Sequence, residues 1–269
     1  MAAVFASLPE KALFTFPPRS DPAAITAPQA HTGSLTSPPP FTIPHDLYQA
    51  ALDVKVPITI ACAYAVTAKL LNLYNQSNGK KPWAISKTRP FFAFVLLHNI
   101  LLALYSGWTF LGMLHTLGSS LVSPSGPNGL AGTLDSLCRM TGSGGFGEDV
   151  YYNETSARWT SLSSSPAVSV DGAPTATASG RIWNEGLAFY GWIFYLSKFY
   201  EVLDTFIILA KGKLSSTLQT YHHAGAMLAM WAGIRYMAPP IWMFVLVNAG
   251  IHAMMASSNV ENPSDGKAC

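Results

Sequence analysis

The sequence predicts an all-α fold, a polytopic membrane helix bundle with about five transmembrane helices. Of the 269 residues, 49% are hydrophobic and only 11% are charged, whereas soluble domains average roughly 25% charged residues. The mean hydropathy is positive, +0.25, although both ends of the chain and one internal stretch are rich in polar residues. The apolar residues must therefore be concentrated in blocks, and a block of roughly 20 residues crosses a bilayer as a helix.

Five apolar blocks follow one another along the chain, and each is predicted to form a membrane helix. They occupy residues 56–74, 90–117, 187–210, 217–236 and 239–256. Short basic links join the first block to the second and the third to the fourth. A long stretch rich in Gly, Ser, Thr and Pro separates the second block from the third, which predicts a loop there.

This pattern divides the chain into three parts. Residues 1–54 are rich in Pro, Ser, Thr and Ala, and we expect them to be mostly disordered because they contain too few apolar residues for a core. Residues 55–256 are predicted to form the transmembrane domain, which contains the long loop at 118–182. Residues 257–269 are a polar tail.

The positive charges predict the orientation of the helices. Six basic residues lie in the two short links: Lys80, Lys81, Lys87, Arg89, Lys211 and Lys213. Because basic links stay on the cytosolic side, five alternating helices place the 118–182 loop and the N-terminus in the lumen and the C-terminus in the cytosol. The glycosylation sequon Asn153-Glu-Thr155 then falls on the lumenal side, where glycosylation occurs.

Charge and cysteine content argue against two kinds of ligand. The net charge of +2 is too small to indicate nucleic-acid binding. The three cysteines show no metal-type spacing, and we expect no metal site.

The third block carries charges that a lipid-facing helix does not tolerate. Lys198, Glu201 and Asp204 lie within it, followed directly by Thr205. Each charge at membrane depth costs at least ~2.5 to 3.5 kcal/mol, and positions i, i+3 and i+6 lie on one face of a helix. The three charges are therefore predicted to point together into the protein interior.

Three other blocks bring polar side chains as well. They are His98 and Asn99 in the second block, Gln219, His222 and His223 in the fourth, and Asn248 and His252 in the fifth. In an alternating bundle the end of the third helix and the start of the fourth meet on the cytosolic side, so Asp204 can approach His222. His252 lies in the second half of a helix that runs toward the same side. The sequence predicts one polar pocket that opens toward the cytosol.

Each of these residues also has a simpler interpretation. A histidine on an apolar helix is more often a hydrogen-bonded core residue than a catalyst. Lys198 and Glu201 can be an i, i+3 ion pair that makes burial tolerable. The remaining polar groups can be helix-packing contacts, and the basic links can be topology determinants. Four helices that each bring polar groups, with an adjacent histidine pair among them, favour a functional site.

The ordered motifs resemble the ELO family of very-long-chain fatty acid elongases. The family pattern Lys-x-x-Glu-x-x-Asp-Thr matches Lys198 to Thr205, the following histidine box matches Gln219 to His223, and Asn-x-x-x-His-x-x-Met matches Asn248 to Met255. The Arg-Pro-Phe followed by His-Asn in the second block is also similar, so the resemblance extends over residues 87–255. It implies a multi-pass endoplasmic-reticulum enzyme with seven helices, six of which enclose a tunnel for the acyl chain.

The resemblance also implies a reaction. A long-chain acyl-CoA condenses with malonyl-CoA and releases CO2 and CoA, leaving a 3-oxoacyl-CoA, and no bound cofactor is needed. His222 would be the nucleophile that carries the acyl group, and His252 an acid/base or enolate stabiliser. His223 and Asp204 would orient the catalytic imidazole. The expected substrate-binding residues are Lys198, Glu201, Thr205, Gln219, Asn248, His98, Asn99, Lys211 and Lys213.

Some of these residues carry a more specific expectation. Lys198 would either balance the two carboxylates or hold the malonyl carboxylate, and Lys211 and Lys213 would meet the CoA phosphates. The lipid bilayer is an expected partner, and other enzymes of the elongation cycle are further candidates. Gln219 replaces a histidine of the family box and is expected to be structural, because an amide cannot shuttle a proton.

The chain departs from the family after Met255, where a polar tail replaces two further helices. We therefore expect a truncated chain whose tunnel lacks two walls, and a catalytically inactive fragment is one alternative function. A proton-coupled transporter is another, because it also uses buried carboxylates and histidines, although no repeat between halves supports it. A di-iron desaturase would need several histidine boxes, and this chain has one.

Overall fold

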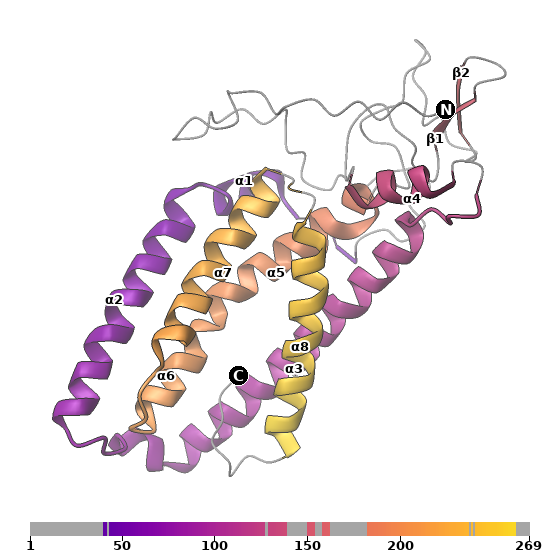
Figure 1. Cartoon of the computed structure of the whole chain (residues 1–269). Coiled ribbons are helices and arrows are strands. Elements are labelled where there is room, and N and C mark those ends of the chain that lie inside the picture. The colour runs from indigo at the N-terminus through magenta and orange to yellow at the C-terminus, as the bar shows by residue number, and fades with distance from the viewer. Residues whose placement is uncertain are drawn as a thin grey trace.

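The computed structural model describes residues 40–41, 43–126, 129–138, 150–153, 158–161, 182–236, 238 and 240–261. This part of the chain is a bundle of long helices that run alternately in opposite directions (Figure 1). The predicted all-α bundle is confirmed. The only strands among the described residues form one antiparallel hairpin, β1 (Val150–Asn153) with β2 (Arg158–Ser161).

Each predicted apolar block is helical. The helices are α2 (Lys55–Ser77), α3 (Arg89–Ser120), α5 (Ala188–Tyr200), α6 (Val202–Ala210), α7 (Thr217–Arg235) and α8 (Ile241–Glu261). Within the described residues, α2 and α3 are long and apolar enough to cross a membrane, and α8 contains a shorter apolar stretch, Ile241–Met255. Side-chain caps define two of the starts: Thr88 accepts a hydrogen bond from the backbone N–H of Phe91, and Ser216 accepts one from Gln219.

The third apolar block is not a single helix. A π-helical turn, Trp183–Leu187, leads into it, and it divides into α5 and α6 at Glu201. At this division the backbone N–H of Asp204 bonds to the carbonyl of Glu201 at 3.1 Å, an i to i+3 contact that tightens the turn. Tight turns within a helix often accompany functional sites, and this one lies in the Lys198–Thr205 motif.

A short helix, α1 (His45–Ala51), lies in the segment that we expected to be mostly disordered. Tyr48 and Leu52 are buried, and the rings of Tyr48 and Trp192 stack with centroids 5.3 Å apart. Tyr48 also donates a hydrogen bond to the carbonyl of Ala188, and Trp231 donates one to the carbonyl of Leu52. The end of this segment therefore packs on the bundle, whereas residues 1–39 lie outside the described residues.

The predicted 118–182 loop contains structure that the composition did not indicate. Its helix α4 (Gly129–Cys138) is held by hydrogen bonds from Thr133 to the carbonyl of Val122 and from Trp242 to the carbonyl of Leu137. Asn153 of the sequon ends β1, and Thr155 lies outside the described residues. The helix and the hairpin lie at the same end of the bundle as α1 (Figure 1).

The two basic links meet at the opposite end of the bundle (Figure 1). The backbone N–H of Trp83 bonds to the carbonyl of Ala210 at 2.9 Å, and Asn75 donates to the carbonyl of Leu209 at 2.8 Å. The indole N–H of Trp83 in turn donates to Asn75 at 2.8 Å. Their basic residues therefore share one end, as alternating helices require, and the membrane side on which that end lies stays a prediction.

Gly212 makes this junction possible, and its replacement is expected to weaken it. Its φ is +77°, and a Cβ there would lie 2.5 Å from the carbonyl oxygen of Lys80. Gly79, with φ +64° and no atom within 4 Å of such a Cβ, is a matched control. The left-handed backbone costs both alanine variants about 1–2 kcal/mol. We expect G212A to lower the melting temperature in detergent clearly more than G79A, whereas equal shifts would contradict the close contact.

Candidate active site

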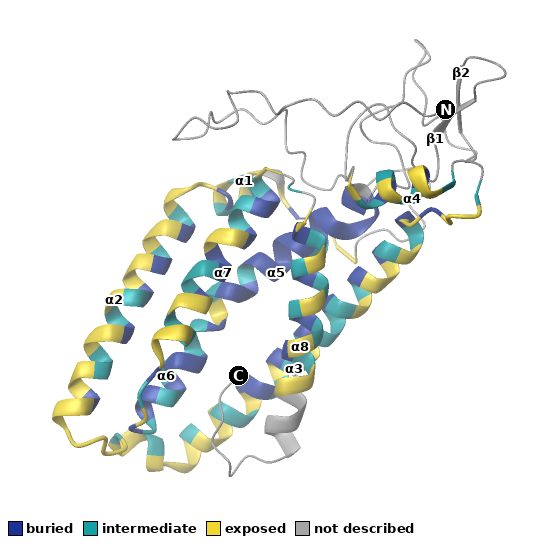
Figure 2. Ribbon diagram, viewed as in Figure 1, coloured by how far each residue is buried: buried dark blue, intermediate teal, exposed yellow. Residues whose placement is uncertain are grey.

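The charged motif lies in the most enclosed part of the bundle. Figure 2 shows that α5 and α6 are buried over most of their surface, whereas α2 and the outer side of α3 are largely exposed. Lys198 and Glu201 are each 1% exposed, and Asp204 and Thr205 are fully buried. The predicted inward orientation of the three charges is confirmed.

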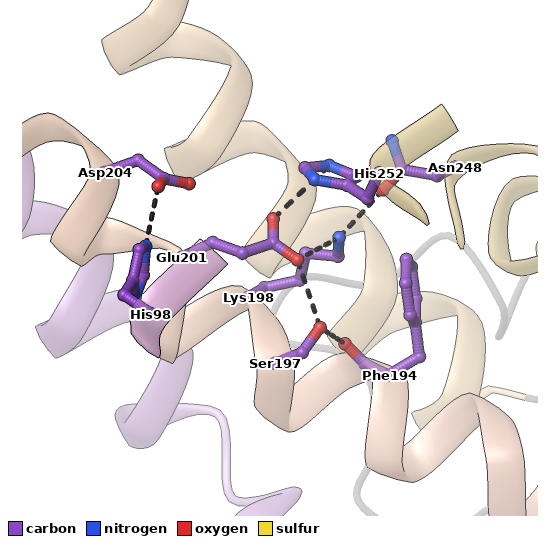
Figure 3. Close-up of polar contacts among 8 residues, drawn as sticks. All are labelled: His98, Phe194, Ser197, Lys198, Glu201, Asp204, Asn248 and His252. Atoms are coloured by element: carbon purple, nitrogen blue, oxygen red, sulfur yellow. Dashed lines mark hydrogen bonds and ion pairs between the residues drawn. The ribbon is translucent and has the colours of Figure 1, made fainter. Parts of the chain in front are cut away.

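Lys198 connects α5 to α8. Its Nζ donates hydrogen bonds to Oε1 of Glu201 and to Oδ1 of Asn248, each at 2.7 Å (Figure 3). The same Nζ lies 3.8 Å from the ring centroid of Phe194, and Ser197 donates to Glu201 Oε1 at 3.1 Å. A buried ion pair persists only when its hydrogen bonds are well satisfied, and these contacts satisfy both the ammonium and one carboxylate oxygen.

The second carboxylate oxygen of Glu201 faces a histidine. His252 Nε2 lies 3.6 Å from Glu201 Oε2, and both side chains are buried (Figure 3). This distance is too long for a hydrogen bond, and Glu201 Oε2 and His252 Nδ1 have no hydrogen-bond partner among the described residues. The two groups therefore lie in ion-pair range with polar atoms available to a ligand.

Asp204 belongs to a separate pair. Its Oδ1 lies 2.8 Å from Nε2 of His98, and Nδ1 of His98 lies 3.0 Å from the hydroxyl of Tyr200. The network favours a His98 tautomer that donates from Nε2 to the carboxylate and accepts from the phenol at Nδ1. We expected Asp204 to orient His222, but the structure pairs Asp204 with His98 of α3.

The two neighbouring histidines of α7 differ in exposure. His223 is 3% exposed, and its ring lies edge-on to Tyr64 with centroids 6.1 Å apart. His222 is exposed, and its ring lies 5.7 Å from that of His223. Successive helical residues point about 100° apart, and here His223 faces the core whereas His222 does not. Tyr64 also bonds to Thr205 at 2.8 Å, which connects α2 to the motif.

The other predicted site residues lie outside this cluster. Asn99 is buried, and its Oδ1 has no hydrogen-bond partner in the described part of the chain. Gln219 is half-buried in the first turn of α7, 3.5 Å from the hydroxyl of Ser215. Lys211 and Lys213 lie at the basic end, where burial, together with repulsion from Lys213, lowers the pKa of Lys211. The structure thus brings Lys198, Glu201, Asn248 and His252 together, and places the link lysines apart from them.

Sequence reasoning missed three residues. Ser197 and Tyr200 flank the charged motif, and Tyr200 is four residues before Asp204, so helical spacing places the two on one face. That spacing could have predicted that Tyr200 lies beside the motif. Nothing in the sequence pattern pointed to Tyr64, because its contact with the motif depends on how α2 packs. Among the residues that the structure describes, no three His, Cys, Asp or Glu side chains are placed to hold a metal ion.

Removal of the Lys198 ammonium is expected to destabilise the bundle. K198M leaves a buried, unpaired carboxylate, a change that typically costs about 3–5 kcal/mol. The double variant K198M/E201Q leaves no uncompensated charge, so we expect it to recover part of that loss. Thermal unfolding of the single variants and the double variant in detergent checks the coupling. Strictly additive effects would show that the two side chains do not stabilise one another.

Comparison with known proteins gives a family match and several relatives. The model of the GNS1/SUR4 (ELO) family matches residues 49–257. "Fatty acid elongase 2" of Trypanosoma brucei brucei is 31% identical over 74 residues, which is 28% of this chain and 27% of that protein. Human "Very long chain fatty acid elongase 3" is 32% identical over 72 residues, 27% of each chain. A "Putative fatty acid elongase" of Dictyostelium discoideum is 50% identical over 42 residues, 15% of this chain and 17% of that one. The chain thus matches about a quarter or less of the length of these relatives, and no solved structure matches it.

Proposed function

Because the chain belongs to the GNS1/SUR4 family, we propose that it is a fatty acid elongase that condenses a long-chain acyl-CoA with malonyl-CoA. The products are a 3-oxoacyl-CoA, CoA and CO2. The observation that carries the proposal is the buried cluster of Lys198, Glu201, Asn248 and His252. It lies in a helical membrane protein whose relatives are named fatty acid elongases.

His222 is the proposed nucleophile. Its imidazole is exposed, so a thioester can reach it, whereas His223 beside it is buried. A ring nitrogen attacks the thioester carbonyl, the C–S bond breaks, and the CoA thiolate leaves, giving an acyl-imidazole. Loss of CO2 from the malonyl unit then forms an enolate, which attacks the acyl carbonyl and releases His222.

His252 is the proposed acid/base. Its Nε2 faces the Glu201 carboxylate at 3.6 Å, and a carboxylate in that position stabilises an imidazolium that forms transiently. The free Nδ1 of His252 is then the atom that exchanges a proton or hydrogen-bonds the enolate oxygen. Glu201 acts in this scheme as a positioning residue.

Lys198 is better suited to balance Glu201 than to hold the malonyl carboxylate. Its Nζ already donates to Glu201 and Asn248 and lies over the ring of Phe194. An ammonium so fully engaged would have to break these contacts to bind a substrate. We assign the CoA phosphates to the basic end, where Lys211 and Lys213 precede α7 by a few residues.

This assignment fits the dimensions of α7. His222 is five residues beyond the helix start at Thr217, which is about 8 Å at 1.5 Å per residue. A CoA whose phosphates contact the basic links can therefore extend its thioester toward His222. We propose that the basic end faces the cytosol of the endoplasmic-reticulum membrane, with the long loop in the lumen. The bilayer and other enzymes of the elongation cycle are the proposed partners.

The nucleophile is tested by replacing His222 in the full chain. Membranes that contain H222A are expected to incorporate labelled malonyl-CoA into a long-chain acyl-CoA at least ~100-fold more slowly, the range lost with a group that takes part directly in catalysis. H115A removes another exposed histidine, on α3 far from the cluster, and is expected to retain activity.

A second measurement detects the intermediate directly. With acyl-CoA alone and no malonyl-CoA, mass spectrometry is expected to show one acyl group on the peptide that carries His222, and none in H222A. Undiminished activity of H222A would overturn the nucleophile assignment. A lack of incorporation by the unaltered chain would contradict the proposed condensation.

A further inference from the structure

A cavity of about 550 Å³ lies between α3 and α5. Its walls are Leu101, Leu102, Leu104 and Trp108 on α3 and Leu196 and Ser197 on α5. This volume is within the roughly 300–1,000 Å³ of small-molecule sites. The cavity is a separate feature from the Lys198 cluster, although Ser197 contacts both.

Two hydrogen-bonded bridges hold the cavity open. Tyr105 donates to the carbonyl of Ile193 at 2.6 Å at one end, and Tyr200 bonds to His98 at 3.0 Å at the other. The bridges are seven residues apart on each helix (98 to 105, and 193 to 200), a rise of about 10 Å. Between these two bridges, α3 and α5 are held at a distance that their own side chains do not fill.

The mouth of the cavity faces away from α8. On α3, Phe110 lies against Gly250 of α8, whereas the cavity residues Leu101 and Leu104 are 48% and 68% exposed. They continue a row of exposed leucines on the same side of α3 that includes Leu97 and Leu111. Because α3 is long and apolar enough to span a membrane, the cavity opens to the hydrocarbon of the bilayer.

The lining excludes a charged or strongly polar occupant. It contains no ionisable side chain besides its two tyrosines, and their hydroxyls are engaged in the two bridges. The Ser197 hydroxyl is directed to the carbonyl of Phe194 and to Glu201. A carboxylate or phosphate would find no donor here, and burying it unpaired would be costly.

The depth of the cavity in the bilayer indicates which part of a lipid it can bind. Leu104 is 15 residues from Arg89 at the basic end of α3, about 22 Å along the helix, and it is near the middle of the Arg89–Ser120 span. The hydrocarbon core of a bilayer is roughly 30 Å thick, so the middle of the span lies where acyl chains end, far from any headgroup.

We propose that this cavity binds the terminal part of an acyl chain of a bilayer phospholipid. The site is independent of the condensation reaction and would exist in an inactive chain as well. The bound tail contacts Ser197 and Tyr200, whose hydroxyls bond to Glu201 and His98, and so lies one residue from the buried cluster.

Photo-crosslinking of the full chain in nanodiscs tests the site. Phosphatidylcholine with a diazirine at the tail end of one acyl chain is expected to label the segments 101–108 and 196–200 strongly. The same lipid with the diazirine near the ester is expected to label them several-fold less. Two results would overturn the proposal. One is stronger labelling of these segments by the ester-proximal probe than by the tail-end probe. The other is stronger labelling by a free fatty acid that carries a diazirine, added in competition with the phospholipid.

Matched variants separate the cavity from general lipid contact. L104W fills the cavity from α3 and L196W fills it from α5, whereas L111W adds the same bulk to an exposed α3 site outside the lining. Both filling variants are expected to lose the tail-end label, and L111W to keep it. If labelling is unchanged in L104W and L196W, or if L111W loses as much label as they do, the probe reports only lipid that surrounds the protein, and the proposal is wrong. If one filling variant fails to fold, the other decides between these outcomes.

Discussion

The ion pair between Lys198 and Glu201 is the interaction on which the rest of the arrangement depends. Neither charge is tolerable alone at 1% exposure, so their positions are fixed by one another and by Asn248 and Ser197. The pair draws α8 against α5 and, through the other oxygen of Glu201, sets the place of His252. One charge pair thus joins two helices and positions the polar groups of the candidate site.

A second set of hydrogen bonds surrounds the other carboxylate of the motif, Asp204. Asp204, Tyr200 and His98 link α6, α5 and α3 with a continuous set of hydrogen bonds. Asp204 is separated from Glu201 by the tight turn between α5 and α6, so the two carboxylates take different histidine partners. Two buried carboxylates in distinct environments are typical of sites where acid and base roles are divided.

The sequence was sufficient to predict helices in the five apolar blocks and the inward face of the motif, because block length and the spacing of Lys198, Glu201 and Asp204 depend only on helix geometry. The partner of Asp204 could not be predicted, because it depends on the tight turn at Glu201 and on how α3 packs. For adjacent His222 and His223, spacing alone does not show which side chain is buried, because that depends on how α7 packs. The docked α1 was missed because the buried side chains in and beside it, Ile43, Tyr48 and Leu52, lie in a polar, Pro-rich stretch without a long apolar pattern.

The docking of α1 has a consequence for biosynthesis. All of its hydrogen bonds to the bundle that are described above go to residues 140 or more positions later in the chain, as far as Trp231. The ribosome therefore synthesises α1 long before its binding surface exists, and the surface that receives it, which includes Trp192 and Trp231, is complete only once α7 has been made. Whole domains generally fold in the order of synthesis, but within this bundle α1 can complete its contacts only after α7 has been made.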